Sequence, residues 1–156
     1  MDTFDRKILA KLQSDGAASN QELADVAGLS ASQCSRRRAQ LERDGVIEGY
    51  RARLDPEALG LDVTVFISIT LERHSRRTSE SFHAFLERLD EVQEAHAMTG
   101  DADYLVKVTV PTLHALSDFV NETLLANEAV NQVRSNIVLK TVKRDGGLPI
   151  KPSAVV

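Results

Sequence analysis

Residues 19–45 read SNQELADVAGLSASQCSRRRAQLERDG, and this stretch contains two closely spaced helix starts. Residues 19–22 and 30–33 both have the Ser-x-x-Glu/Gln spacing of a capping box, in which two side chains satisfy the free amides at a helix N-terminus. Gly28 lies between them, where a helix end favours left-handed backbone that glycine adopts easily. The stretch therefore predicts a helix-turn-helix motif at about residues 20–39.

The flanking residues extend this motif into a small domain. Phe4, Ile8, Leu9 and Leu12 recur at helical spacing, which predicts a first helix over about residues 4–15. After the motif, residues 46–54 alternate in the manner of a strand, and Asp55-Pro56 begins a single helical turn that Gly60 closes. We expect a three-helix DNA-binding domain with a hinge strand over residues 1–60.

A different pattern begins at residue 61. Alternating apolar residues predict strands, and apolar residues at helical spacing predict helices. The expected order is strand 63–71, a helix marked by residues 82–89, strand 92–99, strand 104–110, a helix carrying residues 113–124, and strand 130–142. This βαββαβ order is that of a ferredoxin-like domain. The fold class is therefore α+β, with a second domain over residues 61–144 and a tail over residues 145–156.

The sheet of this second domain is expected to be apolar on both faces. Phe66, Leu105, Val138 and Val142 have the parity opposite to the main apolar stripes of their strands. Their side chains would leave apolar area on the face that the helices do not cover. We expect a second subunit to cover it, so the chain should form at least a dimer.

Composition restricts the class of protein. The chain of 156 residues has a net charge of −4 and one cysteine, Cys34, so neither a disulfide framework nor a zinc-ligand pattern is present. The N-terminal residues lack the features of a signal peptide, and no apolar run is long enough to span a bilayer. These features predict a cytoplasmic protein that does not associate with a membrane.

Basic charge is concentrated in residues 30–43, which contain the second helix of the predicted helix-turn-helix motif. Residues 30–43 contain four arginines and one acid, a local charge of +3, whereas thirteen acids exceed ten bases from residue 61 onward. A helical wheel directs Arg36 and Gln40 outward, and Arg38 inward beside Cys34 and Leu41. Arginine and glutamine are suited to guanine and adenine edges in the major groove.

The expected DNA-binding residues are Ser30, Ser32, Gln33, Arg36, Arg37, Arg38, Gln40 and Arg43. Arg38 is expected to pack its stem inward and extend its charged head toward phosphate. The alternative is that the arginines form an ordinary solvated helix face. The adjacent capping boxes and the glycine turn favour contact with double-stranded DNA.

An enzyme is the first alternative class. His74, His83, His96 and His114 lie in different expected elements, with no nucleophile or carboxylate at triad or metal spacing. Cys34 is expected to be a small core residue and not a reactive thiol. The sequence predicts no catalytic activity, no metal and no cofactor.

Across almost the whole chain the sequence resembles the Lrp/AsnC family of feast/famine transcriptional regulators. The resemblance rests on residues 4–9 (FDRKIL), 22–24 (ELA), 28–30 (GLS), Arg37, 41–50 (LERDGVIEGY) and 100–106 (GDADYLV). It implies a DNA-binding regulator that forms dimers and assembles further, often to octamers. It also implies an amino-acid effector bound between subunits near the Gly-Asp-x-Asp loop.

The loop at residues 100–103 permits two interpretations. Glycine and aspartate favour hairpin turns for backbone reasons alone, so the loop could be only a turn. Given the resemblance, loop amides freed by Gly100 would bind the effector's α-carboxylate, and a carboxylate such as Asp103 would accept its ammonium. The candidate effector-binding residues are His96, Met98, Gly100, Asp101, Asp103 and Leu113 from the loop's own subunit, with Asn136 and Val138 across a subunit contact.

A nucleoid-type protein that binds DNA with little sequence preference and no effector is the second alternative class. Such a protein would share the fold of a regulator, so the sequence does not distinguish these two classes well. A regulator should prefer its operator over random DNA by roughly 10³ or more at physiological salt.

Overall fold

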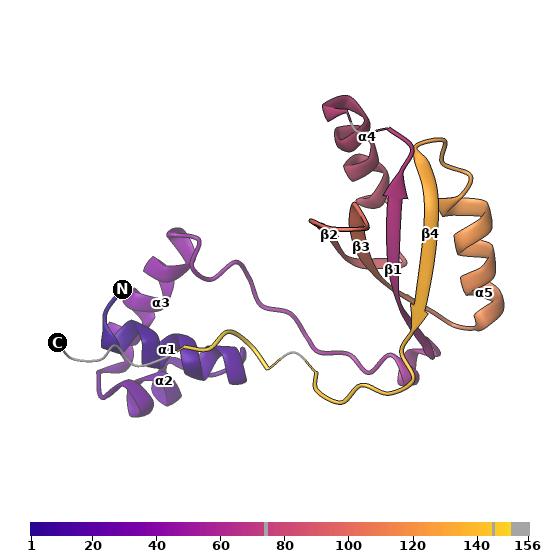
Figure 1. The fold of residues 1–156 in the computed structure, drawn as a ribbon. Coiled ribbons are helices and arrows are strands. Elements are labelled where there is room, and N and C mark those ends of the chain that lie inside the picture. The colour runs from indigo at the N-terminus through magenta and orange to yellow at the C-terminus, as the bar shows by residue number, and fades with distance from the viewer. Residues whose placement is uncertain (74, 145, 151–156) are drawn as a thin grey trace. The chain divides into compact units, whose positions relative to one another are not determined.

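The computed structural model describes residues 1–73, 75–144 and 146–150. Its backbone forms two compact units, labelled by element in Figure 1. The helical unit comprises Met1–Arg53 with the stretch from Lys143, and the sheet unit comprises Leu54–Val142.

The helical unit contains α1 (Thr3–Ser14), α2 (Asn20–Ala27) and α3 (Ala31–Arg43). Each helix begins with a capping box, so the two capping boxes predicted from the sequence are confirmed, and Asp2 with Asp5 forms another at α1. Gly28 ends α2 in the left-handed region, with φ 74°. The predicted helix-turn-helix is therefore present.

Small and aliphatic side chains fill the core between these helices. The core consists of Ile8, Leu12, Ala18, Leu23, Ala24, Ala27, Cys34 and Leu41. Cys34 is fully buried, as the sequence predicts, and burial raises the pKa of its thiol. From α3 the core takes only Cys34 and Leu41 among the described residues, so this helix is held by few apolar contacts.

The strand predicted over residues 46–54 is absent from the described chain. This segment has no ladder partner, and Val46, Tyr50 and Leu54 are exposed. The prediction was wrong because an alternating pattern becomes a strand only when another strand accepts its hydrogen bonds. The predicted single turn does form, as η1 (Glu57–Leu59), and Gly60 closes it in the left-handed region.

The sheet unit contains a four-stranded antiparallel sheet in the order β2-β3-β1-β4. Its described strands are β1 (Val63–Leu71), β2 (Val92–Ala97), β3 (Tyr104–Val110) and β4 (Val130–Ile137). The helices are α4 (Arg76–Leu86) and α5 (Leu113–Asp118), and η2 (Phe119–Leu124) continues α5 as π-helix. The predicted βαββαβ order is confirmed.

One face of the sheet and both helices form a single apolar core. Alternate residues of β1 and β3, such as Ile67 and Val106, form one buried cluster with residues of the helices. The helical members include Phe82 of α4, Leu116 of α5 and Leu124 of η2. The alternation that predicted these strands therefore reflects real burial on one face.

The last strand is shorter than the sequence predicts. It ends at Ile137, and the Val138 amide then donates to the Thr64 carbonyl at 2.9 Å. Because β1 begins at Val63, no neighbouring strand is available to pair with later residues. Val142 is consequently not part of the sheet and is 92% exposed.

The face of the sheet opposite the helices mixes apolar and charged side chains. Phe66 is 38% exposed and its neighbour Leu105 is half-buried, as expected for an apolar patch. Lys107 donates to Glu94 at 2.9 Å on the same face, so the apolar area is narrower than the sequence suggests.

The stretch from Lys143 returns to the helical unit. Gln13 of α1 donates to the Leu148 carbonyl and accepts from the Leu148 amide, both at 2.8 Å. This pair fixes the described part of the C-terminal stretch against α1. None of the helices in the described chain has both the length and the apolar content needed to cross a membrane.

Candidate nucleic-acid interface and effector loop

The outer face of α3 is the candidate nucleic-acid interface. Its capping box holds the helix start, because the Ser30 hydroxyl accepts from the Gln33 amide and the Gln33 side chain accepts from the Ser30 amide at 2.9 Å. Gln33, Arg36, Arg37 and Gln40 line a shallow hollow on this face. The structure thus brings together four of the eight predicted DNA-binding residues.

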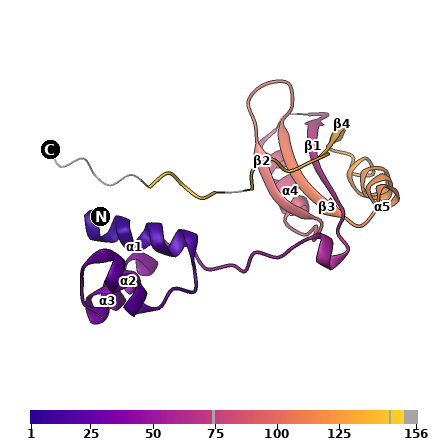
Figure 2. The ribbon, with the colours of Figure 1, turned by 90° about the horizontal axis from the view of Figure 1, so that it is seen from below.

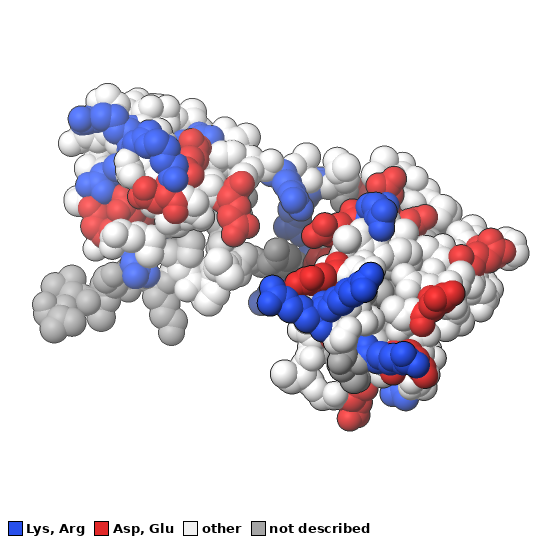
Figure 3. All heavy atoms as spheres, turned by 90° about the horizontal axis from the view of Figure 1, so that it is seen from above, with Lys and Arg blue, Asp and Glu red and all other residues white. Residues whose placement is uncertain are grey.

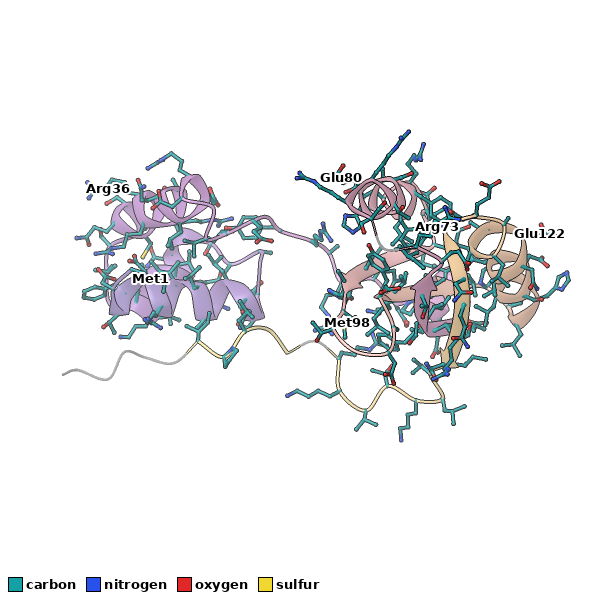
Figure 4. All side chains as sticks on the ribbon, turned by 45° about the horizontal axis from the view of Figure 1, so that its top comes forward. Met1, Arg36, Arg73, Glu80, Met98 and Glu122 are labelled. Atoms are coloured by element: carbon teal, nitrogen blue, oxygen red, sulfur yellow. The ribbon has the colours of Figure 1, made fainter. Side chains whose placement is uncertain are left out.

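Arg36 is the least engaged of these residues. Its side chain lies on the side of α3 that faces away from α1 (Figure 4). Among the residues that the structure describes, it has no hydrogen-bond or ion-pair partner, and it is exposed. An unpaired guanidinium on a narrow helix is well suited to a phosphate or a guanine edge.

Arg37 is bound to the start of α1. Its Nη1 donates to Asp2 at 2.8 Å and to Asp5 at 2.7 Å, and its guanidinium lies 5.4 Å from the Phe4 ring centroid. These carboxylates raise the pKa of Arg37. The Asp5 amide and then Arg37 lower the pKa of Asp2. Arg37 therefore joins two helices in addition to lining the hollow.

Arg38 is also engaged within the helical unit. Its guanidinium lies 4.6 Å from the Tyr50 ring centroid and donates to Glu42 at 3.1 Å and to the Ala18 carbonyl at 3.3 Å. The Tyr50 hydroxyl donates to the same Glu42 carboxylate, and these bonds lower the pKa of Glu42. The predicted inward stem is present, while the charged head lies against protein groups.

The remaining predicted residues lie on the exposed surface of α3. Gln40 donates to Asp44 and accepts from Arg43, both at 2.6 Å, and the Ser32 hydroxyl lies 3.1 Å from that of Ser30. These exposed bonds are easily exchanged for bonds to DNA, because water already competes for them.

The sequence interpretation missed Asp2 and Asp5 as partners of the motif. They lie more than thirty positions from Arg37 in the chain, and no local spacing signals such a pair. Figure 3 shows Lys and Arg side chains gathered on the helical unit with acidic side chains beside them. The basic surface of α3 is therefore partly neutralised by the protein's own carboxylates.

The candidate effector loop connects β2 and β3 beyond the end of the sheet (Figure 2). Gly100 has φ 120°, a backbone conformation that requires glycine. The Asp103 carboxylate accepts from the Leu71 amide at 2.7 Å, and its backbone carbonyl accepts from the Met98 amide at 2.8 Å. Asp103 thus anchors the loop to β1, while Asp101 is exposed.

The structure does not bring all predicted effector residues together in one subunit. Tyr104 at the start of β3 pairs with Ile69, and Val110 at its end pairs with Val63. Leu113 follows that far end, about 20 Å from the loop at roughly 3.3 Å per residue. Leu113 therefore does not reach the loop of its own subunit.

The residues predicted to act across a subunit contact lie away from the loop, Asn136 beside the middle of β1 and Val138 near its start. Asn136 pairs with Phe66, and Val138 donates to Thr64. His96 and Met98 lie at the loop end, where His96 is exposed 3.6 Å from Glu94. Asn136 and Val138 would therefore have to approach a loop from a second subunit, as the sequence analysis expects.

A hollow adjoins the base of the loop on the helix side of the sheet. It measures about 430 Å³ and is bounded by β2 residues including Ala95 and Ala97, by Tyr104, and by His83 and Glu87 of the α4 segment. His83 Nε2 lies 3.0 Å from the Tyr104 hydroxyl. A hollow of this size is large enough for a small molecule.

The described histidines remain separate from one another. His83 contacts Tyr104, His96 contacts Glu94, and His114 lies 3.6 Å from Asp118, while His74 lies outside the described residues. Within the described chain, no group of three or more His, Cys, Asp or Glu side chains is arranged to hold a metal ion.

A capped helix-turn-helix in one chain with a ferredoxin-like domain defines a class, the DNA-binding transcriptional regulators with a ligand-binding domain. Residues 1–42 match the AsnC-type helix-turn-helix domain, and residues 64–148 match the Lrp/AsnC ligand binding domain. The chain belongs to the Lrp/AsnC family.

Two named relatives match almost the whole chain. The leucine-responsive regulatory protein of Salmonella typhimurium is 43% identical over 151 residues, covering 97% of this chain and 92% of that protein. The Escherichia coli protein of the same name is 42% identical with the same coverage.

Solved structures share the fold. A transcriptional regulator of Neisseria meningitidis in complex with L-methionine has TM-score 0.91 and 38% identity, covering 96% of both chains. Escherichia coli AsnC has TM-score 0.84 and 31% identity, covering 93% of this chain and 96% of that one. The chain is thus an effector-modulated transcriptional regulator, as the sequence predicts.

Proposed function

We propose that this regulator recognises its operator through the outer face of α3, with Arg36, Gln33 and Gln40 in the major groove. The observation that carries this proposal is Arg36, an exposed guanidinium without a protein partner among the described residues, on a helix whose start is fixed by a capping box. Ser30, Ser32 and Arg43 would contact phosphate, which fixes the register of the helix on DNA.

We further propose that an amino acid modulates DNA occupancy by binding at the loop of residues 98–103. Support comes from Gly100, whose backbone is open on the Cβ side, from the exposed carboxylate of Asp101, and from the hollow that begins at Ala97 and Tyr104. The relative from Neisseria meningitidis was crystallised with L-methionine. Loop amides would hold the α-carboxylate, and Asp101 or Asp103 would accept the ammonium.

We propose that the effector acts between subunits of a dimer or a larger assembly such as the family's octamers. A ligand in such a contact changes an assembly equilibrium only by its differential affinity for the two states, typically 1–3 kcal/mol. We expect regulation and no catalysis, because the family model that matches residues 64–148 is that of a ligand binding domain.

Operator selection tests the DNA proposal. Duplexes selected from a random pool by the purified protein should bind roughly 10³-fold more tightly than random DNA at physiological salt. Equal affinity for both would instead support a nucleoid-type protein.

Thermal shift with the twenty amino acids and common keto acids tests the effector proposal. At about 100 times its dissociation constant, a ligand should add roughly 2.7 kcal/mol of stability. Asp101→Ala should lose this shift while its unliganded melting temperature stays unchanged, and Asp103→Ala should also melt earlier because the Leu71 amide loses its acceptor. Asp90→Ala is the control, because Asp90 is an exposed carboxylate of the sheet unit between α4 and β2, outside the loop. If no compound stabilises the wild type, the loop is only a turn.

A further inference from the structure

The start of α1 and the outer flank of α3 are joined by a closed set of charge-assisted hydrogen bonds. One oxygen of Asp2 accepts from the Asp5 amide and the other from Arg37, while one oxygen of Asp5 accepts from the Asp2 amide and the other from Arg37. Each carboxylate thus caps α1 and binds the recognition helix at the same time. The Asp5 side chain is only 14% exposed, so its bond to Arg37 is partly shielded from solvent.

The position of Arg37 on α3 gives this contact a mechanical consequence. Cys34 and Leu41, the buried residues of α3, lie seven positions apart on one line along the helix. Ala31 adds a partly buried apolar contact about 60° from that line, on the side of Arg38, so the side of Arg37 has no apolar core contact from α3 among the described residues. At 100° per residue, Arg37 projects about 60° to one side of Cys34 and Arg38 about 40° to the other. The two anchored arginines therefore oppose rolling in both directions.

We infer that Asp2 and Asp5 are specificity-determining residues that act through Arg37, a positioning residue, by fixing the roll of α3 against α1. This inference rests on the proposed operator recognition by α3. The roll angle decides which base edges Arg36, Gln33 and Gln40 reach, because these side chains lie on the same helix. A change of this angle would misplace them without unfolding the unit.

The same two carboxylates oppose DNA binding in a purely electrostatic sense. They place negative charge beside the basic face of α3, and DNA binding depends strongly on the positive charge that meets phosphate. Removing them should strengthen binding to any duplex if they have no positioning role. The two interpretations therefore predict opposite changes in operator affinity.

Neutralising substitutions separate the interpretations. Asp5→Asn and the double variant Asp2→Asn/Asp5→Asn keep side chains that can cap α1, since asparagine is a strong N-cap residue. Asp25→Asn on α2 is the control, because Asp25 is exposed and its side chain accepts a hydrogen bond only from Gln21, at 3.2 Å, among the described residues. It removes one charge from the same unit without touching α3.

The measurement is the dissociation constant of the full-length protein for a selected operator and for a random duplex of equal length at one salt concentration. For the double variant, random-DNA binding should stay equal or strengthen, while operator preference falls about tenfold, the loss of one good base contact. Asp5→Asn alone should also lower the operator preference, but by a smaller factor. Asp25→Asn should leave the preference unchanged.

Three results have distinct meanings. If Asp5→Asn and the double variant keep the operator preference as Asp25→Asn does, Asp2 and Asp5 have no positioning role and the inference is overturned. If the wild type has no preference, the proposed operator recognition itself fails. Loss of binding to both duplexes together with a lost helical circular-dichroism signal would show a folding role only, which also overturns the inference.

Discussion

At the scale of single residues, three consecutive arginines of α3 have different partners. Arg36 has none in the described chain, Arg37 binds Asp2 and Asp5, and Arg38 binds Glu42 and packs on Tyr50. A lone guanidinium contributes little to folding stability, whereas a bound one helps to hold two elements together. Substitutions at neighbouring positions should therefore separate recognition from stability.

Arg36→Ala should weaken operator binding by about 1–3 kcal/mol and leave the melting temperature unchanged. The reason is that Arg36 donates no hydrogen bond to the described protein and is free to contact DNA. Fluorescence anisotropy at several salt concentrations measures the affinity and shows whether the lost contact was to phosphate.

Arg77→Ala is the matched control for this variant. Arg77 is an exposed arginine at the start of α4 in the sheet unit, so its removal changes net charge equally. Operator affinity equal to that of wild type in the folded Arg36→Ala variant would contradict the assignment of α3 as the reading element.

At the scale of elements, helix starts are the best-defined local feature of the helical unit. At the start of α3 the Ser30 hydroxyl accepts from the Gln33 backbone amide, and the Gln33 side-chain oxygen accepts from the Ser30 backbone amide. These reciprocal bonds satisfy amides that the helix itself leaves unpaired. The start of α3 therefore does not depend on contact with DNA.

Ser30→Ala should lower the free energy of unfolding of the helical unit by about 1 kcal/mol, the usual value of an N-cap. Urea denaturation followed by circular dichroism at helical wavelengths measures this change. Ser35→Ala within the same helix should be neutral or slightly stabilising, because alanine is the better helix former there. A Ser30→Ala variant as stable as Ser35→Ala would show that the capping box contributes nothing.

At the scale of the whole molecule, the open face of the sheet leaves Phe66 38% exposed beside the half-buried Leu105. Apolar side chains at the centre of a sheet face are normally covered, and a second copy of the chain would cover them. A symmetric dimer would place two α3 helices on half-sites about 34 Å apart in a pseudo-palindrome.

Light scattering at micromolar concentration should therefore report at least a dimer. The Phe66→Arg substitution should lower the molecular mass that it measures. The charge would lie in the apolar centre of the contact, where it has no partner. Val26→Arg is the control, since Val26 is an exposed apolar residue of α2 in the helical unit, 48% exposed. A monomeric wild type would rule out both the dimer and the palindrome.

Sequence alone was sufficient for most of the fold. Capping boxes, glycine helix ends and strand alternation each involve only a few neighbouring residues. These local signals predicted α1, α2, α3 and the βαββαβ order. The outward face of α3 followed from the helical period alone. The segment of residues 46–54 shows the limit, because its alternation has no strand partner within the described chain.

The partners of the site residues were decided by tertiary structure only. Arg37 meets Asp2 and Asp5, and Asp103 meets the Leu71 amide, across more than thirty residues of chain in each case. The separation of Leu113 from the effector loop likewise depends on strand register. Local sequence determines the dihedral angles and exposed faces of elements, whereas packing of distant segments determines which charges meet, because only folding brings them within hydrogen-bond distance.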